Sequence, residues 1–108
     1  LVKYAKERRI EIIPEIDVPA HSHSWGKAFE GVIVNCSTVA RREQNPLNVY
    51  PLDPSNPKTF QIIRSILKQI IDIFPSKYLH IGGDEVIDAC WSELPHIRQW
   101  VKEQNLTI

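Results

Sequence analysis

The sequence lacks an excess of charge of either sign, because thirteen Lys and Arg residues balance thirteen Asp and Glu residues among 108. A chain with no net charge has no field that draws it to nucleic acid or to an anionic membrane. The sequence also lacks an apolar run near the roughly 18 residues that a membrane span needs. We therefore expect neither nucleic acid nor a membrane span, and any binding must come from a local site on one domain, residues 1–108.

Cysteine is scarce. Cys36 and Cys90 are the only two, and they lack the CxxC spacing of a zinc site. Two cysteines are too few for a fold built on disulfides, so the residues alone favour free, buried thiols. Glycine-rich phosphate loops of the G-x-G-x-x-G and P-loop kinds are also missing. Their absence disfavours a nucleotide-binding α/β sheet.

The first nine residues lack the layout of a signal peptide and resemble the last turns of a helix. We therefore expect a fragment of a longer protein. Sequons at Asn35 and Asn105 match the acceptor pattern for N-glycosylation. Chance often produces that pattern, so the two sequons indicate a secretory route only weakly.

Two short apolar segments each end in polar residues. Residues 10–17 (IEIIPEID) are rich in β-branched side chains and predict a buried parallel strand, with Pro14 near its end. Residues 77–81 (KYLHI) predict a second strand, which leads through two glycines to a pair of adjacent carboxylates. The polar residues at these two ends are Glu15, Asp17, His21, Asp84 and Glu85.

Helical patterns surround the second strand. Residues 27–55 show no sustained periodicity and predict a long loop. Residues 57–74 predict a helix that starts at Pro57, and we expect its apolar stripe to pack into the core. A second amphipathic helix is predicted over residues 94–102, with Trp100 in its buried stripe.

This order of helices and strands predicts an α/β fold with a parallel sheet. An open doubly wound sheet and a (β/α)8 barrel both fit the order, and both bind ligands at the carboxyl ends of their strands. The two polar clusters fall at those ends, although they come from distant parts of the sequence. Adjacent residues of a strand point to opposite faces, so Asp84 and Glu85 need a local turn to serve one ligand.

Two motifs carry a resemblance to a known family. Residues 80–86 (HIGGDEV) resemble the signature of family 20 glycoside hydrolases, the β-N-acetylhexosaminidases. Residues 14–21 (PEIDVPAH), followed by residues 24–26 (SWG), resemble that family's preceding strand and loop, with Ala20 in place of the usual glycine. The pair Cys90-Trp91 resembles the eukaryotic lysosomal and secreted members.

The resemblance implies a TIM barrel, a (β/α)8 catalytic domain, of which this chain holds the third and fourth strands in about two β/α units. It also implies hydrolysis of terminal non-reducing N-acetylglucosamine or N-acetylgalactosamine from N-acetyl-β-hexosaminides. The reaction retains configuration and is substrate-assisted, through an oxazolinium intermediate. The expected partner is a glycoconjugate substrate, with no cofactor and no metal. A lysosomal or secreted location and a homo- or heterodimer of the full-length protein are also expected.

Residue roles follow from the resemblance. Glu85 is the expected general acid and base, and Asp84 holds the 2-acetamido group of the substrate. His21 pairs, in this family, with an aspartate on an earlier strand that is not in this chain. Asp17 and Glu15 are expected to support substrate binding. The resemblance also replaces the free thiols with a Cys36–Cys90 disulfide, which would stabilise the fold by about 3–5 kcal/mol in the chain-entropy model.

Two rival interpretations stay open. A metal-dependent hydrolase would use His21, His23, Asp84 and Glu85 as a mixed ligand set, although two adjacent carboxylates suit tetrahedral geometry poorly. A non-catalytic, lectin-like protein or an inactive fragment is the other rival. An incomplete barrel exposes unpaired sheet edges, so we expect residues 1–108 alone to be inactive.

Overall fold

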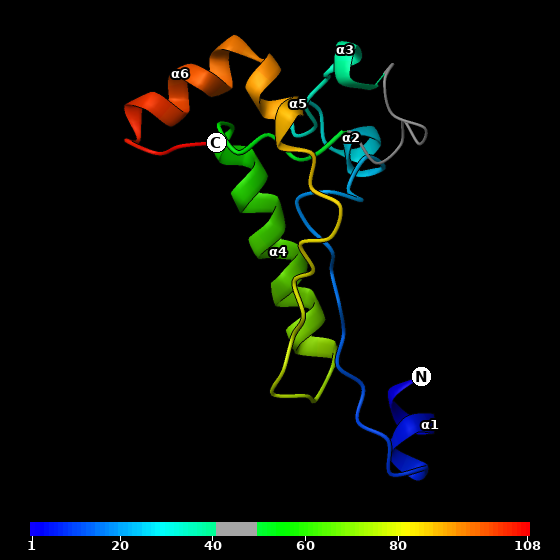
Figure 1. Cartoon of the computed structure of the whole chain (residues 1–108). Coiled ribbons are helices and arrows are strands. Elements are labelled where there is room, and N and C mark those ends of the chain that lie inside the picture. Colours follow the sequence, from blue (N-terminus) through cyan, green and yellow to red (C-terminus); the bar gives the residue numbers. More distant parts are fainter. Residues whose placement is uncertain (41–49) are drawn as a thin grey trace.

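The computed structural model describes residues 1–40 and 50–108, so part of the predicted loop, residues 41–49, lies outside the described residues. The molecule is elongated, with extents of 51 × 32 × 25 Å. Figure 1 shows α4 along its length, α1 at one end, and α2, α3, α5 and α6 around the other end. The helices of the described part are α1 (Val2–Glu7), α2 (Trp25–Ala28), α3 (Ser37–Ala40), α4 (Pro57–Ile73), α5 (Asp88–Glu93) and α6 (Pro95–Glu103).

Helix α4 confirms the helix predicted from Pro57 onward. The Asn56 side chain caps it by accepting the Lys58 N–H at 3.0 Å, and Pro57 occupies the first turn, where a missing N–H costs nothing. The chain turns extended at Phe74, directly before Pro75. The helix therefore begins and ends where its local sequence directs.

The other helical predictions need correction. Two four-residue helices lie where no helix was predicted, and both are too short to show a periodic pattern: α2 overlaps the start of the predicted loop, and α3 lies within it. The helix predicted over residues 94–102 corresponds to α6, but α5 precedes it and Leu94 separates the two. Pro95 accounts for the break, because it disfavours helical geometry at the residue before it and suits the first turn of a new helix.

The two predicted strands are extended segments, not regular strands. Residues 10–18 and 77–82 run parallel and share one bridge, between Glu15 and His80. Ile16 N–H donates to His80 O and His80 N–H donates to Pro14 O, both at 3.0 Å. The direction and pairing agree with the prediction, but within the described residues each segment has one neighbour only, and Pro14 has no N–H to extend the ladder.

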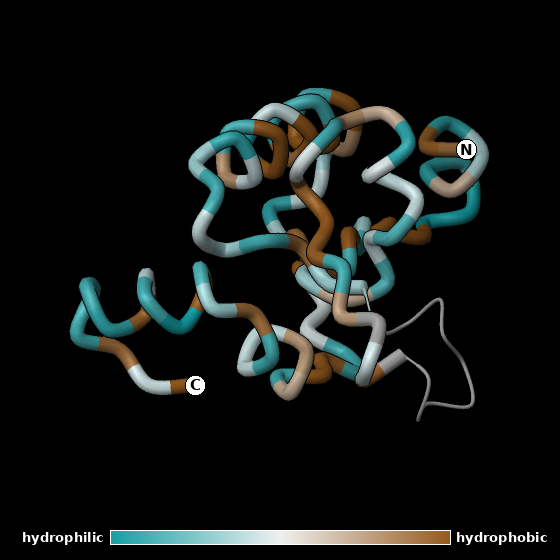
Figure 2. The backbone as a smooth tube through the Cα atoms, turned by 90° about the horizontal axis from the view of Figure 1, so that it is seen from above, coloured by the Kyte–Doolittle hydropathy of each residue, from teal (hydrophilic) through white to brown (hydrophobic). Residues whose placement is uncertain are grey.

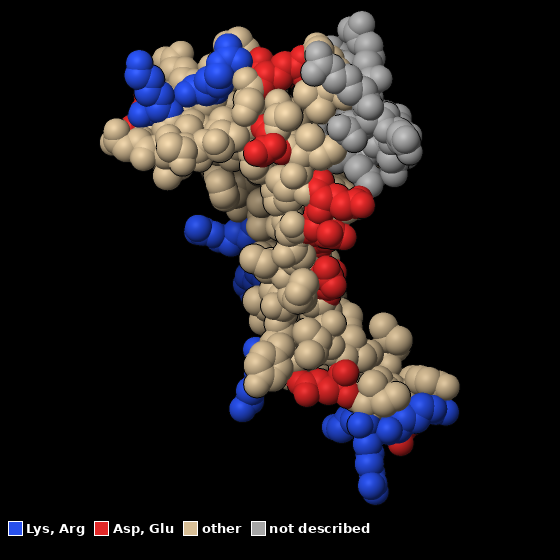
Figure 3. Space-filling model, in the orientation of Figure 1, with Lys and Arg blue, Asp and Glu red and all other residues tan. Residues whose placement is uncertain are grey.

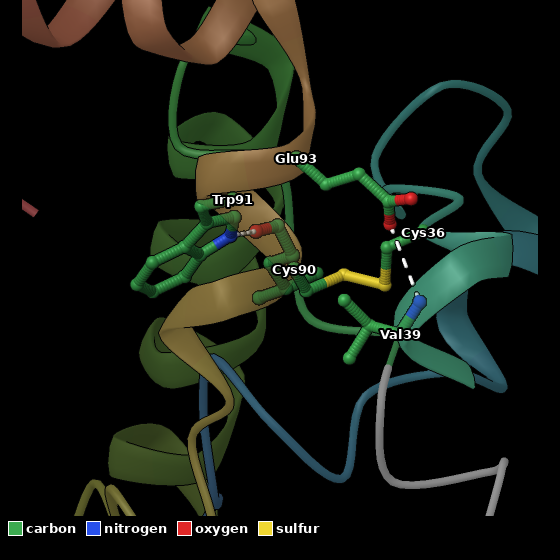
Figure 4. Close-up of a disulfide and its surroundings, with 6 residues drawn as sticks. Cys36, Val39, Cys90, Trp91 and Glu93 are labelled. Atoms are coloured by element: carbon green, nitrogen blue, oxygen red, sulfur yellow. Dashed lines mark hydrogen bonds between the residues drawn. A yellow bond between two sulfur atoms is a disulfide. The ribbon is translucent and has the colours of Figure 1, made fainter. Parts of the chain in front are cut away.

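The core lies at the end that holds α3, α5 and α6. Its fully buried members are Val34, Cys36, Cys90 and Ile97. Cys36 and Cys90 form the disulfide that the resemblance implied, with their Cα atoms 5.2 Å apart (Figure 4). Trp91 Nε1–H donates to Leu52 O at 3.0 Å, and the Val39 N–H donates to a Glu93 carboxylate oxygen at 3.4 Å. The disulfide and the Val39–Glu93 hydrogen bond hold α3 against α5, and the Trp91–Leu52 hydrogen bond ties α5 to the segment before α4.

The apolar stripe of α4 does not pack into this core, which corrects the prediction. Phe60 is 53% exposed and Ile71 is 60% exposed. Figure 2 shows apolar and polar positions alternating along the helical coils, as an amphipathic pattern requires. A stripe is buried only when another layer covers it, and within the described residues helix–helix packing joins α5 to α6 and α3 to α5. Trp100 on α6 is likewise only half-buried.

Charge is distributed unevenly over the surface. Figure 3 shows acidic side chains along one edge of the narrow middle of the molecule, whereas Lys and Arg lie at its two ends and along the opposite edge. Among the described residues, no helix combines the length and the apolarity needed to cross a membrane. The acidic edge runs beside the paired extended segments.

Candidate active site

The parallel pairing brings the two polar clusters together. Because residues 10–18 and 77–82 run in the same direction, the loops that follow them meet at one end. Val18 N–H donates to Ile81 O at 3.2 Å, which keeps the segments paired up to the start of these loops. Glu15 and Asp17 are two residues apart and therefore face the same side of their segment. That side faces the turn that carries the adjacent carboxylates.

The turn after residue 81 is built on left-handed backbone. Gly82 has φ +69°, Gly83 has φ +116° and Glu85 has φ +49°. Glycine is required at Gly82, since a Cβ atom there would overlap the Asp17 carboxylate. The left-handed geometry at Glu85 bends the chain between two side chains that a regular strand would point to opposite faces. The structure thus contains the local turn that adjacent Asp84 and Glu85 need.

Asp17 anchors this turn. Its Oδ1 atom accepts the Gly83 N–H at 2.7 Å and the Asp84 N–H at 3.3 Å. The Gly83 amide is the main reason that the pKa of Asp17 lies below its usual value, with the Asp84 amide and the charges of His21 and His80 acting in the same direction. Partial burial opposes this shift, and the side chain is 22% exposed. Asp17 is therefore held as a carboxylate that accepts hydrogen bonds.

His21 lies between Asp17 and Glu85. Its Nε2 atom is 3.4 Å from Glu85 Oε2 and 3.7 Å from Asp17 Oδ2. His21 also has a left-handed backbone, with φ +51°. Behind it, the Ser22 hydroxyl is fully buried and donates to Ala20 O and Asp17 O. The imidazole thus touches the proposed acid directly, whereas its expected partner on an earlier strand is outside this chain.

Glu15 does not contact the carboxylate pair. Its Oε1 atom lies 3.2 Å from Nδ1 of His80, the residue opposite it in the parallel bridge. Sequence reasoning assigned His80 no role. Only the register of the pairing places His80 opposite Glu15, so alternation within one segment does not reveal the contact.

One group of side chains has the spacing of a cation site. Asp17, His21 and Asp84 each offer a nitrogen or oxygen atom, and these atoms lie within 4.8 Å of one another. His23 is not a member, because its ring lies against Tyr50 with a centroid separation of 5.0 Å. The ligand set of the metal-dependent interpretation is therefore not the one that the described residues bring together, and both Asp17 and His21 already have hydrogen-bonding or charged partners.

The site gathers carboxylates and an imidazole, which are groups that general acid–base catalysis uses. Glu85 is 59% exposed and can reach a ligand, and the adjacent Asp84 and the nearby His21 face the same space. Paired extended segments with a crossover helix and a carboxylate pair at their carboxyl ends define the class, an α/β protein with polar residues at the carboxyl ends of its paired segments. The sequence profile "Glycosyl hydrolase family 20, catalytic domain" matches residues 1–108. The chain belongs to glycosyl hydrolase family 20.

Several known proteins are similar to this chain. "Beta-hexosaminidase subunit A1" of Dictyostelium discoideum is 36% identical over 99% of this chain and 19% of its own length. "Beta-hexosaminidase 3" of Arabidopsis thaliana is 39% identical over 99% of this chain and 18% of its own length. The chain thus spans about a fifth of the length of the curated relatives that it matches.

Solved structures of family 20 enzymes are also similar to this chain. The chitobiase of Flavobacterium johnsoniae is 36% identical with a TM-score of 0.80, over 99% of this chain and 16% of that one. An exo-β-N-acetylglucosaminidase of Vibrio harveyi in complex with N-acetylglucosamine is 28% identical with a TM-score of 0.79, over 99% of this chain and 17% of that one. Both the sequence and the arrangement of the elements therefore place this chain with family 20 proteins.

Proposed function

We propose that a complete polypeptide containing this chain hydrolyses terminal non-reducing N-acetyl-D-hexosamine residues from N-acetyl-β-hexosaminides. The observation that carries the proposal is the convergence of Glu85, His21 and Asp84 in a member of family 20. The similarity of the chain to proteins named β-hexosaminidase supports the same activity. Because the chain is about a fifth of their length, the activity belongs to the complete polypeptide, and residues 1–108 alone are expected to be inactive.

Glu85 is the proposed general acid and base. It would protonate the departing glycosidic oxygen and later take a proton from the attacking water, a role typically worth about 10²–10⁴-fold in rate. The His21 Nε2 atom lies 3.4 Å from the Glu85 carboxylate and is therefore placed to orient that carboxylate. The exposure of the Glu85 side chain leaves room for a sugar to approach.

Asp84 is proposed to hold the 2-acetamido group of the substrate. It would accept the N–H of that group and direct the carbonyl oxygen at the anomeric carbon, so that the substrate supplies its own nucleophile. The carboxylate would also stabilise the positive charge of the oxazolinium intermediate. The turn supports this division of labour, because Asp84 and Glu85 are neighbours yet both face His21.

We also propose that the extended segments are the third and fourth strands of a (β/α)8 barrel. Their parallel direction, the intervening helix α4 and the polar carboxyl ends support this placement. The exposed apolar side chains of Ile13, Phe60, Ile71 and Ile81 also support it, because neighbouring strands and helices of a barrel would cover them. The structure of the complete polypeptide tests the placement.

A lysosomal or secreted location is proposed on two grounds. The Cys36–Cys90 disulfide persists in oxidising compartments and is uncommon in the cytosol. Asn35 and Asn105, the two sequon residues, are both exposed and thus reachable for N-glycosylation. Mass spectrometry of the protein from its native source, before and after removal of N-glycans, tests both positions.

Homo- or heterodimerisation of the full-length protein stays a prediction, which light scattering tests.

Hydrolysis of a fluorogenic aryl N-acetyl-β-glucosaminide by the complete polypeptide tests the function. We expect turnover, and a fall of roughly 10² or more in the Glu85→Gln variant. Glu93→Gln is a matched control, since Glu93 contacts α3 and lies away from the turn. A folded polypeptide that binds N-acetylglucosamine without turning it over would support the lectin-like alternative and exclude the proposed reaction.

A further inference from the structure

The turn that carries the carboxylate pair is held by side chains through its backbone amides. Three consecutive amides, those of Gly82, Gly83 and Asp84, each donate to a side chain. Asp17 accepts two of these bonds, and His80 accepts the first, from the Gly82 N–H at 3.1 Å. Glycine can adopt many backbone conformations, so the chain at Gly82 and Gly83 is flexible by itself. The hydrogen bonds to these acceptors favour the one left-handed conformation that the structure shows.

We propose that His80 is a positioning residue, whose Nδ1 atom holds the Gly82 amide and thereby the orientation of Asp84 and Glu85. The inference rests on the proposed function of those two acids. His80 touches neither the substrate nor the reacting atoms in this proposal. It acts through the two glycines, at the point where the paired segment ends and the turn begins.

Two groups lie near the Nδ1 atom of His80. The Gly82 N–H can only donate, so Nδ1 is the acceptor of that hydrogen bond. Glu15 Oε1 lies 3.2 Å from the same Nδ1 and is itself an acceptor. A ring that carried a proton on Nδ1 would donate to Glu15 and leave the Gly82 amide without its partner.

The main-chain pairing makes His80 a firm support. Its own N–H donates to Pro14 O, and its carbonyl oxygen accepts the Ile16 N–H, both at 3.0 Å. These bonds tie the His80 backbone to the segment that carries Asp17, the second acceptor of the turn. The two acceptors therefore come from paired pieces of backbone and hold the turn from both sides.

Loss of this support should lower kcat more than it raises KM. The orientation of Glu85 and Asp84 matters most in the transition state, when the proton is transferred and the acetamido group attacks. Most contacts that bind the sugar in the ground state do not depend on the turn, so KM should change less. Losing one hydrogen bond that orients reacting groups should lower kcat roughly tenfold.

Two substitutions of His80 distinguish the effect of losing the hydrogen-bond acceptor from the effect of changing the size of the side chain. In His80→Asn, the amide oxygen sits at the position of Nδ1 and can accept the Gly82 N–H, whereas His80→Leu has a similar volume and no acceptor. His96→Leu is the matched control, because His96 makes its hydrogen bond to Asp53, away from the turn. Each variant of the complete polypeptide is assayed for kcat, KM and thermal unfolding.

We expect His80→Leu to lower kcat roughly tenfold with KM changed less than about twofold, while His80→Asn recovers most of the loss and His96→Leu keeps the wild-type kcat. Equal activity of wild type and His80→Leu would overturn the role of His80. Equal losses in the Asn and Leu variants would also overturn it, because a side-chain acceptor would then be irrelevant. A wild-type polypeptide without turnover would instead refute the proposed function itself.

Discussion

Asp17 Oδ1 lies 2.7 Å from the amide nitrogen of Gly83, although the two residues are 66 positions apart in the sequence. This hydrogen bond joins the two family motifs at one atom, since Asp17 belongs to the first motif and Gly83 to the second. The same oxygen also accepts the Asp84 N–H, so one carboxylate positions the residues that carry the proposed chemistry.

Replacing Asp17 with Asn should misplace the turn. The amide oxygen can still accept a hydrogen bond, but the charge that strengthens the bonds to Gly83 and Asp84 is lost. We expect kcat of the complete polypeptide to fall by roughly 10–100-fold. Asp72→Asn is the control, because Asp72 is exposed on α4 and pairs with Lys68, away from the turn. Wild-type kcat in Asp17→Asn would contradict the anchoring role.

The lowered pKa of Asp17 predicts a pH dependence of stability. Because the folded state holds this pKa below its unfolded value, the carboxylate stabilises the fold at pH values above the unfolded value of about 4. That stabilisation is lost as the pH falls through the lower, folded value. The difference in melting temperature between wild type and Asp17→Asn should therefore be constant above about pH 5 and shrink below about pH 4. A difference that grows on acidification would contradict the direction of the pKa shift.

Gly82→Ala should damage the turn more than Gly83→Ala. Both glycines have left-handed backbone, so each substitution introduces strain. At Gly82, however, the new Cβ would also overlap the Asp17 carboxylate, whereas at Gly83 it would meet no heavy atom within 4 Å. We expect Gly82→Ala to lose at least about 10²-fold in kcat/KM and Gly83→Ala to lose clearly less. Equal losses would show that backbone strain alone decides the effect.

The Cys36–Cys90 disulfide should stabilise the fold. It closes a loop between residues 54 apart in sequence, and chain entropy predicts a contribution of about 3–5 kcal/mol. A Cys36→Ser, Cys90→Ser double variant should therefore unfold at a lower temperature than the oxidised protein. Reductant should bring the wild type close to the double variant and leave the double variant unchanged. Indifference of the wild type to reductant would contradict the prediction.

Chelation separates the glycosidase from a metal-dependent hydrolase. The atoms of Asp17, His21 and Asp84 lie close enough to share a cation, but the proposed reaction needs only their charges and hydrogen bonds. We expect prolonged dialysis against EDTA to leave turnover unchanged within about twofold. Loss of turnover that added Zn²⁺ restores would instead support a metal-dependent reaction.

Local sequence predicted much of the structure correctly. Asn56 and Pro57 mark the start of α4, and the motif resemblance identified family 20, which the profile match confirms. The direction of residues 10–18 and 77–82 was also predicted, because alternation of strands and helices favours parallel pairing. These features depend on residues close together in the chain or on patterns that the sequence displays directly.

Other features could not be predicted from local patterns. The exposed face of Phe60 and Ile71 has the periodicity of a core stripe, and only the absence of a covering layer within the described residues leaves it open. The short helices α2 and α3 have too few residues for periodicity to show. His80 was overlooked because its contacts, Glu15 and Gly82, reveal a role only when the two segments are paired.

The sequence by itself determined which chemical groups this protein has: two adjacent carboxylates after two glycines, a histidine after a first acidic segment, and two cysteines. Only the tertiary structure decided how they meet. Asp17 reaches the Gly83 amide, and His21 reaches Glu85, because parallel pairing brings together segments that are far apart in the chain. Side-chain identity is local, whereas distances between side chains depend on backbone pairing that no short stretch of sequence encodes.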